Sequence, residues 1–194
     1  ERIRLPDPRE SVQEFVDRLG ALLRGGRYDA LIPGSDASLI AISEHRDGLE
    51  PSTRLGLPSR EAVRRSVDKL VLLEAATAAG LAPPASLPCT DLGEADDAAA
   101  ALGFPVVLKP VQSFVPVNGG LRQRSVAVAA DAAELASTVP DFPAPFIVQR
   151  FEHAQFVSCT GVVAEGRLLA LTTSRVLRLW PPSAGMHCYS ETVV

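Results

Sequence analysis

The chain has 194 residues, of which 46% are hydrophobic and 22% are charged, so its composition fits a globular protein of one large or two small domains. A formal net charge of −4 argues against general attraction to nucleic acid or to an anionic membrane, and no apolar run approaches the ~20 residues that span a bilayer. The sequence shows no signal peptide and its three cysteines lack metal-type spacing, so we expect a cytoplasmic protein with reduced thiols.

The first third of the sequence predicts alternating helices and strands, in the order that forms parallel sheets. Apolar side chains recur at helical spacing over residues 10–23, and the pair Gly25 and Gly26 ends that helix. Residues 28–33 predict a short apolar strand, and a helix is expected over residues 39–45 with its caps in the polar turn before it.

A longer helix is expected between two cap signals, Ser59 at its start and Gly80 at its end. Apolar residues recur at helical spacing on both sides of Lys69, so the sequence predicts one unbroken helix. The proline-rich run at residues 81–88 then predicts a joint between two domains.

Beyond this joint, residues 83–149 predict a small module in which helix, strand, loop, strand, helix and strand follow one another. The expected elements are helices over residues 92–102 and 131–139 and strands over residues 104–109, 125–128 and 146–149. The module has three basic residues against seven acidic ones, and the acids fall on the helices. The bases, Lys109, Arg122 and Arg124, fall on the strand–loop–strand element, as expected of a sheet that faces an anion.

The last part of the sequence predicts a β-hairpin, with strands over residues 156–163 and 168–177 around a tight turn. Arg175 and Arg178 lie in this region. Because arginine binds planar anions bidentately, one interpretation places them on a γ-phosphate or a substrate carboxylate. The other interpretation places them on a solvated face of the strand.

The chain has only two lysines, Lys69 and Lys109, against 17 arginines. A compact ammonium at the end of a buried strand is suited to binding phosphate oxygens, and Lys109 ends such a strand. The count alone is equally compatible with chance.

The loop between the predicted strands of the module has a flexible tip, Asn118-Gly119-Gly120. Backbone amides near glycines can wrap phosphate oxygens, although an ordinary hairpin turn would use the same residues. The chain has neither a Walker A loop nor a Rossmann glycine fingerprint.

Four stretches taken together resemble the ATP-grasp enzymes, in particular the carbamoyl-phosphate-synthase-like, carboxylate–amine ligase branch. They are RYDALIPGSD, LGLPSREAVRRSVDKLVLLEAATAAGLAPPAS, GFPVVLKP and PFIVQRFEHAQFVS, and the resemblance covers nearly the whole chain. It implies an α/β ATP-grasp fold with a partial pre-ATP-grasp domain at residues 1–82, a small ATP-binding subdomain at 83–149 and an incomplete C-terminal subdomain at 150–194. The chain would thus be a fragment, truncated at both ends.

The resemblance implies a role for each nucleotide-binding residue. Lys69 and Lys109 would contact ATP phosphates, and Lys109 would also border the adenine pocket. Asn118, Gly119 and Gly120 would form a mobile lid over the phosphates. The other positions belong to a hinge that reads adenine through its backbone and to a ribose contact: Gln149, Arg150, Phe151 and Glu152 for the hinge, and Gln155 for the ribose.

Two glutamines depart from the family pattern, because the family usually has acidic residues at the positions of Gln149 and Gln155. The family's magnesium ligands would lie beyond Val194, so no metal ligand is expected within this chain. Glu191, the last carboxylate, is expected to be a strand or loop residue.

The activity that the resemblance implies is ATP-dependent ligation by the whole enzyme, with ATP and Mg²⁺ as cofactors. A small-molecule carboxylate would attack the γ-phosphate to give an acyl phosphate, which an amine or another nucleophile would then attack; the fragment itself would be inactive. A homodimer is compatible with this role. Two alternatives stay open: a non-catalytic nucleotide-binding or regulatory module, and an unrelated α/β binding domain with incidental lysines.

Overall fold

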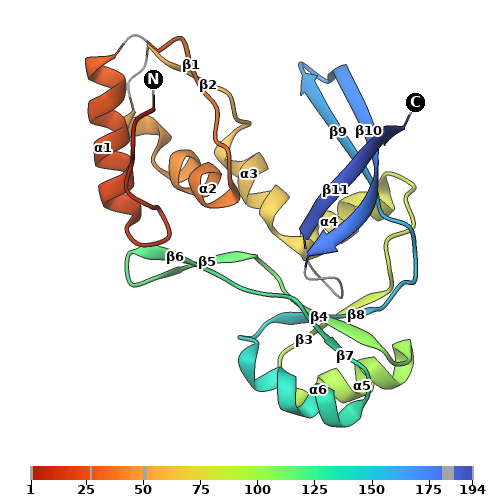
Figure 1. The fold of residues 1–194 in the computed structure, drawn as a ribbon. Helices are drawn as coiled ribbons and strands as arrows, with labels where there is room; N and C mark the ends of the chain where they lie inside the picture. Colours follow the sequence, from red (N-terminus) through yellow and green to blue (C-terminus); the bar gives the residue numbers. More distant parts are fainter. Residues whose placement is uncertain (1, 27, 50–51, 181–185, 194) are drawn as a thin grey trace. The chain divides into compact units, whose positions relative to one another are not determined.

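The computed structural model describes residues 2–26, 28–49, 52–180 and 186–193 and has the mixed α/β structure expected from the sequence (Figure 1). The helices of this part of the chain are α1 (Val12–Gly25), α2 (Asp36–Glu44), α3 (Arg60–Val67), α4 (Lys69–Ala78), α5 (Leu92–Leu102) and α6 (Ala132–Thr138), with short 3-10 turns η1 (Arg46–Gly48) and η2 (Val139–Asp141). The strands are β1 (Ala30–Leu31), β2 (Arg54–Leu55), β3 (Ser86–Cys89), β4 (Val106–Pro110), β5 (Phe114–Val117), β6 (Gly120–Gln123), β7 (Ala127–Ala129), β8 (Phe146–Arg150), β9 (Val157–Ala164), β10 (Arg167–Trp180) and β11 (Met186–Val193).

The chain divides into two compact units, and each unit is built from segments that are distant in sequence. Unit 1 contains Glu1–Pro83, Pro110–Ser125 and Pro145–Ile147. Unit 2 contains Pro84–Lys109, Val126–Ala144 and Val148–Val194.

The core of unit 1 lies between α1 and α2. Helix α1 begins at the N-cap Ser11, whose side chain accepts a hydrogen bond from the Glu14 amide, and ends at Gly26, as the sequence predicts. Its apolar face is buried together with residues of α2 and of the segment after it: Phe15, Val16, Leu19, Leu23, Ala41, Ile42 and Leu49. Burial of this one face stabilises the helix, because isolated helices of this length are marginal in water.

The short strands of unit 1 pair in parallel, since Ala30 lies opposite Arg54 in the β1–β2 ladder. Strand β2 was not expected from the sequence. Helix α2 begins at Asp36, three residues earlier than expected, because Ser35 and Ser38 form a reciprocal capping box.

The expected helix from Ser59 to Gly80 is wrong in one respect: it is broken at Asp68 into α3 and α4. Asp68 has an extended backbone and its carboxylate accepts hydrogen bonds from the amides of Leu70 and Val71, so it is the N-cap of a new helix. The backbone amide of Lys69 donates to the Val111 carbonyl at 3.0 Å. Contact with this distant segment stabilises a break that the apolar periodicity does not reveal.

The segment expected as a loop with a flexible tip forms a β-hairpin, β5–β6, which is the ordinary hairpin turn that the sequence left open as an alternative. Asn118 and Gly119 both have left-handed backbone angles (φ 50° and 82°), which is the geometry of a tight hairpin turn. The hairpin contacts the first residue of α1 and the segment before it: the Val12 amide donates to the Gly119 carbonyl, and the Leu121 amide donates to the Arg9 carbonyl.

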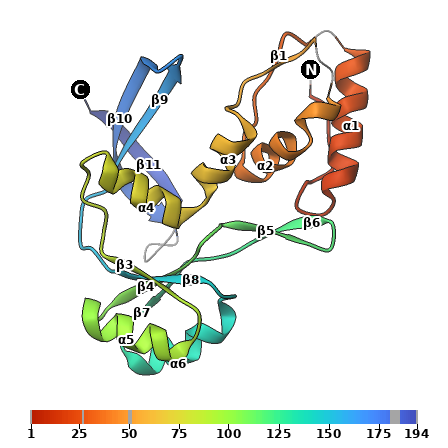
Figure 2. The ribbon, with the colours of Figure 1, turned by 180° about the vertical axis from the view of Figure 1, so that it is seen from behind.

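The first part of unit 2 is built around a four-stranded sheet in the order β3-β8-β4-β7 (Figures 1 and 2). Strands β4 and β7 are antiparallel, and α5 and α6 cover one face of the sheet. Val106 and Leu108 of β4 are fully buried, as are Ala95 of α5 and Leu135 of α6. The two helices and three of the four strands lie where the sequence predicts them.

Strand β3 occupies residues that were expected to form only a proline-rich joint. The sequence signal was misleading because prolines at positions 83, 84 and 88 disfavour an interior strand. Since β3 has only β8 as a neighbour, it is an edge strand, where prolines are tolerated.

A second sheet, in the order β11-β10-β9, follows in unit 2. The predicted hairpin is confirmed by the β9–β10 ladder, whose turn has Glu165 and Gly166 in left-handed conformations. Strand β10 extends to Trp180, beyond the expected end, because β11 pairs with its second half. Among the residues that the structure describes, no helix is both long enough and apolar enough to cross a membrane.

Candidate functional site

A cavity of about 570 Å³ in unit 2 brings together five of the residues singled out from the sequence. These are Lys109 of β4 and the four consecutive residues of the predicted hinge, Gln149, Arg150, Phe151 and Glu152. The rest of the lining is mostly apolar: Pro84, Val107, Val126, Val128, His153, Ala154, Phe156 and Leu179. Apolar walls with a few polar groups are typical of small-molecule sites.

The polar centre of this cavity is a hydrogen-bonded pair. The Lys109 ammonium donates to Gln149 Oε1 at 2.6 Å, and Gln149 Nε2 donates to Ser86 Oγ at 2.7 Å. Gln149 is only 8% exposed. Burial lowers the pKa of Lys109 from its usual range, because a partly buried ammonium loses hydration. Within the described residues, Lys109 has no carboxylate partner.

The backbone of the hinge, residues 149–152, has one amide left for a ligand. The Arg150 amide donates to the Ala85 carbonyl at 2.9 Å, and the Phe151 amide donates to the Pro105 carbonyl at 3.3 Å. The Glu152 amide has no hydrogen-bond partner in the part of the chain that the structure describes. An aromatic edge contact between Phe151 and His153, with ring centroids 4.9 Å apart, flanks it.

Two residues of this site were missed in the sequence and one expected residue lies outside it. Ser86 was hidden in the proline-rich run, and nothing in the local sequence indicates that its hydroxyl reaches Gln149, 63 positions away. His153 is an exposed residue of the loop after β8, and it also lines the cavity. Gln155, the expected ribose contact, is exposed and does not line the cavity.

Lys69 lies in unit 1 and lines a different, smaller cavity of about 260 Å³. It is the first residue of α4, whereas the sequence placed it within a longer helix. Its ammonium donates to Ser113 Oγ at 3.0 Å, and Asp36 and Ser66 also line the cavity. Lys69 lies at the positive end of the α4 helix dipole, and both the ammonium and the dipole favour binding of an anion.

The tip of the β5–β6 hairpin borders a third cavity, of about 350 Å³, also within unit 1. Gly119 and Gly120 line it together with side chains of α1 and α2. A Cβ atom added at Gly120 would meet the carbonyl oxygens of Arg9 and Glu10, so this glycine allows two backbones to approach closely.

The two arginines of interest on β10 have partners on β11. Arg175 forms an ion pair with Glu191 at 3.3 Å, with both side chains about half exposed. The guanidinium of Arg178 lies over the ring of Tyr189, 5.8 Å from its centroid. Neither arginine lines the unit 2 cavity.

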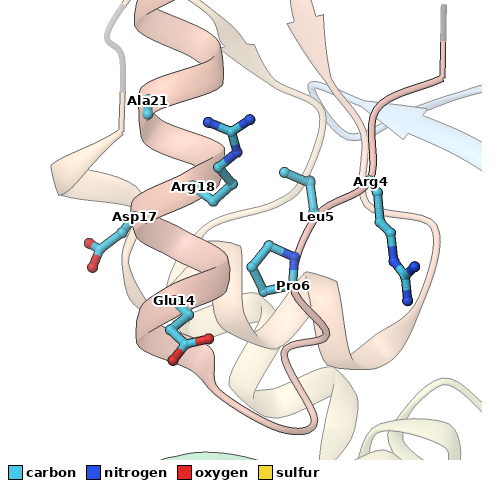
Figure 3. Close-up of a pocket in the computed structure, with 7 residues that line it drawn as sticks. All are labelled: Arg4, Leu5, Pro6, Glu14, Asp17, Arg18 and Ala21. Carbon is cyan, nitrogen blue, oxygen red and sulfur yellow. The ribbon is translucent and has the colours of Figure 1, made fainter.

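A further hollow of about 710 Å³ lies between the N-terminal segment and α1 (Figure 3). Arg4 and Arg18 line it together with Glu14 and Asp17, so positive and negative side chains are balanced there. None of the predicted site residues lies in it. In the described part of the chain, no group of three or more His, Cys, Asp or Glu side chains is arranged to hold a metal ion.

No protein-family model and no curated protein matches the sequence. Solved structures do match the fold. The chain is similar to an L-amino acid ligase from Bacillus licheniformis (TM-score 0.64, 16% identity, covering 89% of this chain and 38% of that one). It is also similar to D-alanyl-alanine synthetase A from Vibrio cholerae (0.61, 15%, 85% and 52%).

A third similar structure is carboxyaminoimidazole ribonucleotide synthase from Aspergillus clavatus, which was solved in complex with ATP (TM-score 0.58, 14% identity, covering 77% of this chain and 38% of that one). In all three comparisons the chain spans between 38% and 52% of the length of the solved protein. A RimK-domain protein from Sphaerobacter thermophilus, which is described as an ATP-grasp protein, gives a TM-score of 0.55. The chain therefore has a mixed α/β structure that resembles part of the ATP-grasp fold.

Proposed function

We propose that this chain is the ATP-binding part of an ATP-dependent ligase of the ATP-grasp type. The observation that carries the proposal is the Lys109 ammonium, which lines a largely apolar cavity without a carboxylate partner among the described residues. A desolvated cation without a counter-ion is a strong site for an anion, since electrostatic attraction is weakly screened there.

The chemistry of the cavity is suited to a nucleotide. A phosphate oxygen binds the Lys109 ammonium, and the Glu152 amide donates to a ring nitrogen of the base. Val107, Val126, Val128 and Leu179 supply flat apolar contact for a purine. The proposed site residues are Lys109 and the hinge residues Gln149, Arg150, Phe151 and Glu152. Gln155 does not line the cavity, and its role as the ribose contact stays a prediction.

The other residues implied by the resemblance keep their roles as predictions. Lys69 and Asn118-Gly119-Gly120 are assigned to phosphate binding, and Arg175 and Arg178 to the γ-phosphate or substrate carboxylate. The division of the chain into a partial pre-ATP-grasp domain (1–82), a small ATP-binding subdomain (83–149) and an incomplete C-terminal subdomain (150–194) is also proposed from the resemblance.

In the proposed reaction a carboxylate oxygen attacks the γ-phosphorus of MgATP, giving an acyl phosphate and ADP. An amine then attacks the acyl carbon and phosphate leaves. Most of the catalytic effect comes from positioning and charge neutralisation, to which a fixed ammonium contributes. Magnesium enters as the ion that accompanies ATP.

Nucleotide binding is tested by the thermal midpoint of the chain with and without millimolar MgATP. A ligand that binds only the folded state raises the midpoint in proportion to the logarithm of its concentration over Kd. We expect a rise that Lys109→Met abolishes and that Arg167→Ala, at an exposed position of β10 outside the cavity, retains. An unmoved midpoint in the unsubstituted protein would rule out the ATP site.

A second candidate, a non-catalytic nucleotide-binding module, is favoured by the amide side chains Gln149 and Gln155 where the resemblance implies acids. The two functions differ in turnover. ADP release from the full-length protein, measured with a panel of amino acids and other small carboxylates, supports the ligase. Tight ATP binding without release under any of these conditions supports the module.

A further inference from the structure

A directed chain of hydrogen bonds crosses three strands of the four-stranded sheet. Lys109 of β4 donates to Gln149 of β8, which donates to Ser86 of β3, whose hydroxyl donates to the Pro84 carbonyl at 2.7 Å. The two ends fix the direction of every bond, because an ammonium can only donate and a carbonyl can only accept. The orientation of the Gln149 amide is therefore determined, with its oxygen toward Lys109.

Ser86 and Gln149 are both held by the sheet. Strand β8, which carries Gln149, lies between β3 and β4 in the sheet order. Gln149 is 8% exposed and Ser86 is half-buried, so neither side chain can exchange its partner for water without a cost in free energy.

The amide holds the ammonium in place without cancelling its charge. A carboxylate at position 149 would form an ion pair with Lys109 and would compete with any anion that enters the cavity. The other charged or titratable side chains of the cavity are Arg150, Glu152 and His153, and none of them forms an ion pair with Lys109 in the described structure. The lowered pKa of Lys109, which burial causes, fits a cation without a counter-ion.

We infer that Ser86 and Gln149 are positioning residues that hold the Lys109 ammonium, with its charge uncompensated, for a phosphate group of the bound nucleotide. Ser86 acts through Gln149 and does not itself line the cavity. The inference rests on the proposed nucleotide site, but the hydrogen-bond chain can be tested without any nucleotide.

The test uses the fact that the chain has only two lysines. Biosynthetic ¹³Cε labelling of lysine gives two side-chain signals, which Lys69→Arg assigns, and a pH titration reports the pKa of each. Because a hydrogen bond to the charged form raises the pKa of an amine, we expect the pKa of Lys109 to fall in the order Gln149→Glu, unsubstituted protein, Ser86→Ala and Gln149→Met. Ser86→Thr retains the hydroxyl and should restore the unsubstituted value.

Lys69 is the internal control for these variants. Its ammonium donates to Ser113, so Ser113→Ala should shift the Lys69 signal and leave Lys109 unchanged. The Ser86 and Gln149 substitutions should do the opposite. A general loss of structure would move both signals, which separates it from a positioning effect.

Affinity for ATP is then measured on the same variants. Loss of one positioning hydrogen bond should weaken binding about 3- to 10-fold in Ser86→Ala, and Ser86→Thr should bind like the unsubstituted protein. Gln149→Glu is the decisive variant, because it should raise the pKa of Lys109 and yet weaken ATP binding by about 10-fold or more. If Gln149 served only in folding, Gln149→Glu would not raise the pKa of Lys109 while lowering the affinity for ATP.

Three outcomes distinguish this inference from the proposed function. If Lys109 titrates identically in Ser86→Ala and Gln149→Met, the positioning chain is wrong even where ATP binds. If the pKa order holds but the unsubstituted protein binds no ATP, the anion role is overturned together with the proposed function. If Gln149→Glu binds ATP as well as or better than Gln149, the idea of an uncompensated charge is wrong while the nucleotide site stands.

Discussion

The two sheets of unit 2 differ in what surrounds them. The strands of the four-stranded sheet are short, but Val106, Leu108 and Val148 are completely buried. The three-stranded sheet contains the longest strand of the described chain, β10 with 14 residues, yet most side chains of β9 and β10 are exposed. The large hydrophobic residues that are exposed in the described part of this sheet include Val157, Val162, Val163, Leu168, Leu169, Leu171, Leu177, Trp180 and Tyr189.

The comparison shows that backbone hydrogen bonds between strands do not by themselves produce a buried hydrophobic core. Burial of apolar surface stabilises by about 25 cal/mol per Å², whereas an intramolecular hydrogen bond replaces one made to water. The four-stranded sheet has two helices on one face, and it carries Lys109 and Gln149. The candidate site is thus attached to the part of unit 2 with the most buried side chains.

The same substitution in the two sheets should give the largest contrast. Leu108→Ala removes a fully buried side chain from β4 and should lower the free energy of unfolding by about 2–5 kcal/mol. Leu168→Ala, on β10, affects a leucine that is 59% exposed and should change it by less than about 0.5 kcal/mol. Urea unfolding followed by circular dichroism measures both. Equal losses would mean that the three-stranded sheet is covered in solution.

The β5–β6 hairpin offers an intermediate case, since backbone contacts with the segment before α1 hold it. Gly120→Ala places a methyl group against the Arg9 carbonyl and should cost about 1–3 kcal/mol through steric strain. Hydrogen exchange should then lose protection at the amides of Val12 and Leu121, which make the contact.

Gly119→Ala is the matched control for that variant. Apart from its two chain neighbours, no described residue has an atom within 4 Å of a Cβ added there, so its effect arises from the left-handed backbone of the turn. Protection at Val12 should persist. If both variants release Val12 equally, the close approach at Gly120 is not what holds the hairpin.

A smaller effect is expected from an ion pair on the surface of unit 1. Arg64 donates to both oxygens of Glu44, at 2.8 and 2.7 Å, and this interaction lowers the pKa of Glu44. Its contribution should be present above the ordinary pKa of a glutamate and be lost as the pH falls through the lowered value. Arg64→Ala should cost about 0.2–1 kcal/mol at neutral pH, and Arg65→Ala, an exposed neighbour, almost nothing. Equal effects of the two substitutions would contradict a role for the pair.

The smallest effect is expected in the stability at alkaline pH. Because the pKa of Lys109 is lowered by burial, the unfolded chain binds more protons than the folded one between the lowered value and the ordinary value of 10.5. Stability should therefore rise with pH in this window relative to Lys109→Met. Thermal unfolding of both proteins between pH 7 and 10 measures the difference, and parallel curves would contradict a lowered pKa.

The sequence predicted the four-stranded sheet better than the residues around it. Helical spacing over residues 92–102 and the apolar run ending at Lys109 are local signals, and both are confirmed. The break at Asp68 was not predictable from the helical periodicity, because it depends on a contact between Lys69 and Val111. Strand β3 was missed because prolines at an edge strand resemble a linker.

The candidate site was likewise predictable only in part. The apolar strand and the hinge indicated Lys109 and Gln149, but the link to Ser86 depends on strand order, which one sequence does not reveal. The expected roles of Arg175 and Arg178 stay predictions. Their partners, Glu191 and Tyr189, lie on β11: the sequence predicted a strand or loop residue at Glu191, but not the pairing of this segment with β10.

The interleaved composition of unit 1 has a consequence for its synthesis. The unit includes Pro145–Ile147 as well as the first 83 residues, so it is not complete until three quarters of the chain have left the ribosome. Contacts between such distant segments slow folding, because long loops must close before the contacts form. Until the β5–β6 hairpin has been synthesised, the start of α1 therefore lacks its backbone partners, and the partly assembled unit exposes apolar surface that can aggregate.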